Sequence, residues 1–234
     1  MTMDAGNGLS KRRILVDLII GVLVFGSIWG FLEAVLGGFL NLIIFPNKGA
    51  IMSSIGVTIM AAAMAYYRKP VMLPCIGIVA ASFKWFNAWL LFIPLNRAQV
   101  INPAMAIFLE SLAFTLVAAL LMDRIRQHIV VGAGAGVLAG FMSAIAYVYF
   151  AVYVTHSPIF ERLGIESIGE FIMGNAVIQA AFFGTFLPLG YLAGEKLATM
   201  SALLLTRRSF YYACSVATIA LCWGISAIAF KAGL

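Results

Sequence analysis

The chain contains a series of apolar runs, each long enough to cross a lipid bilayer as a helix. A membrane-spanning helix needs about 20 apolar residues. Seven runs reach this length, at 14–42, 50–67, 71–94, 101–122, 129–155, 170–194 and 210–231. They lack the roughly ten-residue alternating pattern of barrel strands, so helices are the expected spanning element. The sequence therefore predicts an all-α, polytopic transmembrane helix bundle of about seven spans, or six if the last run lies elsewhere.

The composition predicts one integral membrane domain over residues 1–234, because no stretch between the apolar runs exceeds about twenty residues. Hydrophobic residues make up 63% of the chain and charged residues 10%, against about 45–50% and about 25% in soluble domains. The net charge of +6 is of the kind that reports topology in a membrane protein. The expected surrounding is therefore the lipid bilayer, and nucleic acid is not an expected partner.

The distribution of Lys and Arg predicts how the chain is oriented, because cytoplasmic loops carry the excess of positive charge. Ten of these residues fall on one side: Lys11, Arg12, Arg13, Arg68, Lys69, Arg124, Arg126, Lys196, Arg207 and Arg208. Four fall on the other side: Lys48, Arg97, Arg162 and Lys231. The expected location is the cell membrane, with the polar segment 1–13 in the cytoplasm and, for seven spans, the C-terminus outside.

The first run and the glycine pairs carry two further expectations. The first run would extend about 43 Å as a helix, against a hydrocarbon core of about 30 Å, so it should tilt, kink or break, with Gly37-Gly38 as the expected place. Glycines four residues apart let helices approach closely, and their internal packing is favoured over a docking face for another subunit. These pairs are Gly26 and Gly30, Gly136 and Gly140, and Gly190 and Gly194.

Three ionisable residues lie inside predicted spans, where they are costly and often functional. Glu33, Lys84 and Glu110 lie in the first, third and fourth runs. Counted from Pro94 and Ile101 as span ends, Lys84 and Glu110 both fall about 14–15 Å below the outer surface. The sequence therefore predicts that these two side chains pair, or share a ligand, in the outer half of the bilayer.

Four other residues fall in the same predicted layer. Asn87 is one helical turn above Lys84, Trp85 borders the layer, and Asn175 and Gln179 enter it from the sixth run. Polar groups that converge beside aromatic rings favour a pocket for a small organic ligand. The structural alternative is an ion pair and interhelical hydrogen bonds, with tryptophans forming the interfacial belt.

The sequence contains no motif typical of an enzyme or of a cofactor site. We find no P-loop, nucleophile elbow, HExxH or haem-binding pattern, and the two histidines, His128 and His156, are far apart. We therefore expect no enzymatic activity, no catalytic residues, no metal ligands and no cofactor.

The segments PNKGAIMSSIGVTIMA and GIVAASFKWFNAWLLFIP resemble the substrate-binding S components of energy-coupling factor (ECF) transporters. The resemblance covers residues 14–195. It implies a membrane subunit that binds a vitamin-like small molecule or a metal and relies on a separate ATP-driven energising module. Those proteins usually have six spans, and their first helix carries small residues in its cytoplasmic half, where this chain has ILVDLIIGVLVFG.

Two functions from different classes remain open at this point. The favoured one is a membrane protein that binds or transports a small solute through a polar pocket in the outer half of the bundle. The alternative is a non-catalytic membrane subunit that anchors a larger complex, such as a redox complex. A cavity reached from outside and lined by Lys84 and Glu110 would favour the first. A filled interior and a lipid-facing or glycine-rich face that matches a partner would favour the second.

Overall fold

The computed structural model of the chain describes residues 4–43, 45, 47–158, 164, 166–204 and 208–233. This part of the chain is helical, with no strand among the described residues. The helices are α1 (Asp4–Leu42), α2 (Lys48–Tyr67), α3 (Met72–Leu90), α4 (Ala98–Gln127), α5 (Ile129–Tyr153), α7 (Ile168–Phe171), η1 (Ile172–Ala176), α8 (Val177–Leu204) and α9 (Arg208–Lys231).

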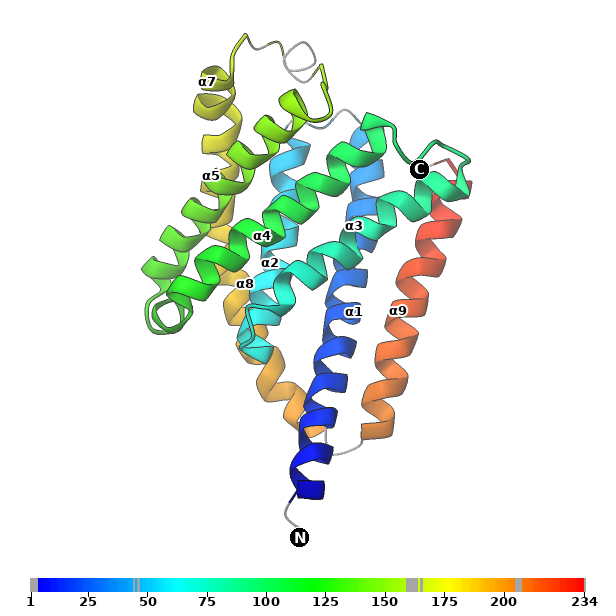
Figure 1. Cartoon of the computed structure of the whole chain (residues 1–234), viewed down its shortest axis with the longest axis vertical. Coiled ribbons are helices and arrows are strands. Elements are labelled where there is room, and N and C mark those ends of the chain that lie inside the picture. Colours follow the sequence, from blue (N-terminus) through cyan, green and yellow to red (C-terminus); the bar gives the residue numbers. More distant parts are fainter. Residues whose placement is uncertain are drawn as a thin grey trace.

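Seven helical segments are long and apolar enough to cross a membrane, which confirms the predicted all-α bundle of seven spans. The sixth span combines α7, the π-helical turn η1 and α8 into one segment, Ile168–Met200. In Figure 1 the start of α1 and the end of α9 lie at opposite ends of the bundle, as an odd number of spans requires. We call the end where α9 finishes the far end. Arg162 and Arg207, two of the charges counted for orientation, lie outside the described residues.

The first helix is longer than the sequence suggested and does not break. α1 has 39 residues, so it extends about 58 Å and projects beyond the hydrocarbon core. It starts at Asp4, within the segment expected to be a polar tail, and stays helical through Gly37 and Gly38. The excess length is therefore accommodated without a break at the glycine pair.

Six of the spans form a closed ring, and α9 lies outside it. α1 packs on α2 and α3, α2 on α8, α8 on α5, α5 on α4, and α4 on α3. α9 packs mainly on α1 and lies at the edge of the bundle in Figure 1. In its most apolar stretch only 17% of the residues are buried, against 28–50% in the other spans.

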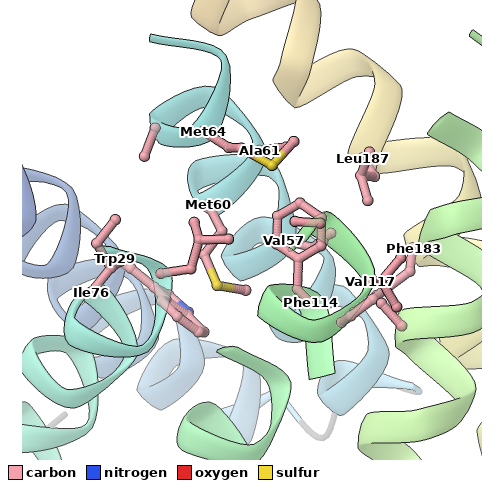
Figure 2. Close-up of a cluster of buried hydrophobic side chains, with 14 of the residues drawn as sticks. Trp29, Val57, Met60, Ala61, Met64, Ile76, Phe114, Val117, Phe183 and Leu187 are labelled. Atoms are coloured by element: carbon pink, nitrogen blue, oxygen red, sulfur yellow. The ribbon is translucent and has the colours of Figure 1, made fainter. Parts of the chain in front are cut away.

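The apolar core fills the middle of the ring. Figure 2 shows Trp29 of α1 and Ile76 of α3 on one side of Met60, and Phe114 of α4 and Phe183 of α8 on the other. All five side chains are buried. On α1, α2 and α4 the polar residues Glu33, Ser53 and Glu110 each lie about one turn toward the far end from a core residue. On each of these three helices a polar residue thus follows a core residue in the direction of the far end, and we refer to these residues as a polar layer.

The three glycine pairs pack inside the bundle. Gly26 and Gly30 of α1 face side chains of α3, Gly136 and Gly140 of α5 face the backbone of α8, and Gly190 and Gly194 of α8 face the backbone of α2. A Cβ at any of these positions would overlap its neighbour. These pairs are therefore occupied by internal contacts, which was the favoured interpretation, and they offer no docking face to another subunit.

Candidate functional site

An ion pair joins α1 to α3 within the polar layer. Lys84 Nζ lies 3.3 Å from Glu33 Oε1, and it also donates a hydrogen bond of 3.3 Å to the backbone carbonyl oxygen of Glu33. The two side chains are 19% and 15% exposed. The pair is thus mostly enclosed, and the layer reaches the surface of the bundle at this point.

The predicted pairing of Lys84 with Glu110 is wrong as an ion pair, since Lys84 pairs with Glu33 instead. The depth estimate used incorrect helix ends. α3 ends at Leu90 and α4 begins at Ala98, so Lys84 lies about 9 Å, and Glu110 about 18 Å, along its helix from the far end. Glu110 is therefore the deeper of the two residues.

Glu110 has a neutral partner on α2. Its Oε1 accepts a hydrogen bond from Ser53 Oγ, and the residue is 6% exposed. Ser53 could not be recognised from the sequence, because a serine in an apolar helix commonly bonds its own backbone and its residue type alone carries no functional signal. Only the approach of α4 to α2 identifies it.

The two carboxylates converge on the beginning of α2. A Cβ added to Gly37 would lie 3.9 Å from Met52 and 4.0 Å from Glu33 Oε1, which places the Glu33 carboxylate at the contact between α1 and α2. Ser53, next to Met52, holds Glu110. The layer therefore brings two acidic groups and one ammonium group together from α1, α3 and α4.

Two buried polar side chains in this region have no hydrogen-bond partner among the described residues. Both amide atoms of Asn87 are unpaired in a residue that is 4% exposed, and Nε1 of Trp29 is unpaired in a fully buried residue. The Trp29 ring lies against Gly56, where an added Cβ would be 2.7 Å from Nε1. Gly56 is one turn from Ser53, so this N–H group lies close to the partner of Glu110. Such unpaired groups usually cost about 1–3 kcal/mol each.

The remaining predicted site residues lie apart from this cluster. Gln179 donates a hydrogen bond of 3.0 Å from Nε2 to Ser143 Oγ and so joins α8 to α5, as the structural alternative expects. Asn175 is half-buried in η1. No polar contact in the described structure joins either residue to Glu33, Lys84 or Glu110. Trp85 is 36% exposed, which places it on the surface of the bundle.

The four-helix polar layer, as we name it, therefore consists of Glu33 and Trp29 on α1, Ser53 on α2, Lys84 and Asn87 on α3, and Glu110 on α4. It offers one carboxylate with only a neutral partner, together with unpaired N–H donors and a carbonyl acceptor. Among the described residues, no group of three His, Cys, Asp or Glu side chains is placed to hold a metal ion. Comparison of the chain with protein-family models, curated proteins and solved structures finds no match.

Proposed function

We propose that this protein binds a small polar solute at the four-helix polar layer and takes part in moving it across the membrane. The buried, unpaired polar atoms of Asn87 and Trp29 in this layer carry the proposal. A purely structural layer would be expected to satisfy its buried donors and acceptors internally, because leaving them unpaired destabilises the fold. A bound solute would supply the missing partners.

The arrangement of the helices gives less support to an anchoring subunit. That function was expected to have a filled interior and a lipid-facing or glycine-rich face that matches a partner. The apolar core does fill the middle of the ring, but the three glycine pairs are buried between helices of the same chain. We also expect a binding protein to keep a route to its site. The partial exposure of Lys84 and Glu33 is consistent with such a route.

We further propose that the chain acts in the manner of an ECF-type S component. The closed ring of six spans, with α9 packed outside it, agrees with the six spans usual in those proteins and accounts for the seventh. In this proposal the energy for transport comes from a separate ATP-driven module. The chain itself has no P-loop.

The proposed orientation places the N-terminus in the cytoplasm and the far end outside, so that the four-helix polar layer lies in the outer half of the bilayer. Its support is the ten-to-four excess of Lys and Arg at the end opposite the far end, because cytoplasmic loops carry the excess of positive charge. Single cysteines introduced near Arg68 and Arg97 in a cysteine-free variant would be labelled in intact cells with a membrane-impermeant reagent. We expect labelling near Arg97 only, and labelling near Arg68 would reverse the orientation.

The decisive variant for solute binding is Glu110→Gln, which keeps the shape of the side chain and removes its charge. Because Lys84 pairs with Glu33, this change leaves no stranded cation, and stability should change by no more than about 1–2 kcal/mol. Native mass spectrometry of gently purified protein should find a bound small molecule in the wild type and in Glu195→Gln, a matched change near the other end, but not in Glu110→Gln. Wild-type protein that carries no molecule, or equal retention in all three, would contradict the proposal.

A further inference from the structure

The charges of the four-helix polar layer do not balance. Glu33 and Lys84 neutralise one another across 3.3 Å, and the second carboxylate, Glu110, is buried with only the hydroxyl group of Ser53 as its partner. A buried carboxylate is costly unless a positive charge or a proton accompanies it. The layer is therefore short of one positive charge at Glu110, which a proton or the cationic group of a ligand would supply.

The position of Lys84 argues against an anionic ligand. Its ammonium group already contacts both the carboxylate and the backbone carbonyl oxygen of Glu33. An anion would have to displace these acceptors and would approach a layer whose net formal charge is negative. A cationic group could bind the Glu110 carboxylate without displacing an existing contact, because Ser53 is neutral and can keep its hydrogen bond to Glu110.

The unpaired groups add a second requirement, because they include hydrogen-bond donors. Trp29 Nε1 and Asn87 Nδ2 can only donate, whereas Asn87 Oδ1 can only accept. A bare metal ion would satisfy the acceptor and leave both donors unpaired. An organic molecule that carries a hydroxyl or carbonyl oxygen near its cationic group can satisfy all of them.

We infer that the solute is a small organic ammonium compound with a hydrogen-bond acceptor a few bonds from its nitrogen, and that its ammonium group binds to the Glu110 carboxylate. Ser53 lies on the ammonium side of the solute, and the Trp29 N–H group and the Asn87 amide serve the polar group at its other end. The inference rests on the proposed function, because it names the chemical class of the solute for that same site.

The test compares solutes that share size and a hydroxyl group and differ in charge. The cationic probes are ethanolamine and 4-amino-1-butanol, the anionic probes are glycolate and 4-hydroxybutyrate, and the neutral probes are ethylene glycol and 1,4-butanediol. Each is titrated into detergent-solubilised protein at constant ionic strength and neutral pH. The thermal midpoint Tm is recorded, since a ligand that binds only the folded protein raises it with concentration.

We expect at least one cationic probe to raise Tm saturably, and the anionic and neutral probes to leave it unchanged. Glu110→Gln should weaken the cationic response about tenfold or more, as the loss of a charge-assisted hydrogen bond predicts. Glu195→Gln should respond as the wild type does. The same Tm curves without solute report whether each variant is folded.

The other outcomes separate this inference from the proposed function. A saturable response to an anionic or a neutral probe only, lost on mutation of the layer, would overturn the cationic solute and leave a solute site standing. A cationic response that persists unchanged in Glu110→Gln would overturn the assignment of Glu110. No response to any probe would overturn the inference, while a small molecule retained in native mass spectrometry would still support the proposed function.

Discussion

The contacts of α8 and the contacts of α1 with α3 hold the bundle together in different ways. α8 meets α2 and α5 through glycines that touch backbone, so the helices approach each other directly: a Cβ on Gly140 would lie 2.7 Å from the Cα of Ala180. α1 meets α3 through side chains, with Gly30 against the Phe83 ring and Glu33 paired with Lys84.

The difference indicates which part of the protein can adapt to a ligand. Close backbone contact leaves a helix pair no room to rearrange, because every side chain along it is already at its limit of approach. Contacts made by long polar side chains can change by rotation about single bonds. The four-helix polar layer lies on the side-chain-mediated side, and the α2–α8–α5 group provides a fixed frame for it.

The largest expected loss of stability comes from breaking the ion pair between Glu33 of α1 and Lys84 of α3. Glu33→Gln removes the charged partner of Lys84 and leaves a mostly buried ammonium group with only the backbone carbonyl oxygen, so the free energy of unfolding should fall by about 3–5 kcal/mol. Unfolding in mixed detergent micelles measures this change. The double variant Glu33→Gln with Lys84→Met should recover most of the loss, because it removes the stranded charge as well. Equal stability of Glu33→Gln and Glu195→Gln would show that the pair contributes little.

A smaller loss of stability is expected where α5 packs on α8 through glycines. Gly136→Ala places a Cβ against the backbone of Phe183 and Gly184, and overpacking of this kind costs about 1–3 kcal/mol. Gly134→Ala, two residues away on the same helix, meets nothing within 4 Å and should be neutral or slightly stabilising because alanine favours helix over glycine. Thermal unfolding of both variants provides the comparison. Similar losses from both would mean that helix α5 is not held by close backbone contact.

The number of spans and their helical structure could be predicted from the sequence, because the hydrocarbon core fixes the length of each apolar run. The residue at which the third span ends could not be predicted. Its apolar run continues to Pro94, whereas α3 ends at Leu90 and the chain turns at Phe92, which has a φ of 55°. Hydropathy does not distinguish apolar residues in a turn from apolar residues in a helix, and the error of four residues displaced Lys84 by about 6 Å in the estimate.

The members of the candidate site could be predicted only in part. Ionisable residues in apolar runs stand out by their cost, so Glu33, Lys84 and Glu110 were identified. Their partners depend on which helices are neighbours, and α1 lies beside α3 although α2 separates them in sequence. Counting residues from a span end gives depth but not the neighbouring helices. It therefore places Gln179 in the layer, although Gln179 lies on another side of the bundle and contacts α5.

The smallest expected loss or gain among the polar residues comes from replacing the unpaired amide of the four-helix polar layer. Asn87→Leu replaces a buried group that has no partner by an apolar side chain of similar shape. Solute-free protein should therefore become more stable, by about 1 kcal/mol, because the cost of an unpaired buried amide is removed.

The same variant should lose solute binding, since Asn87 would supply both a donor and an acceptor to the solute. Thermal unfolding measures the first effect and native mass spectrometry the second. A purely structural role for Asn87 predicts the reverse, a loss of stability with no change in any bound molecule. The direction of the stability change, together with the presence or absence of the bound molecule, therefore distinguishes a role in folding from a role in binding.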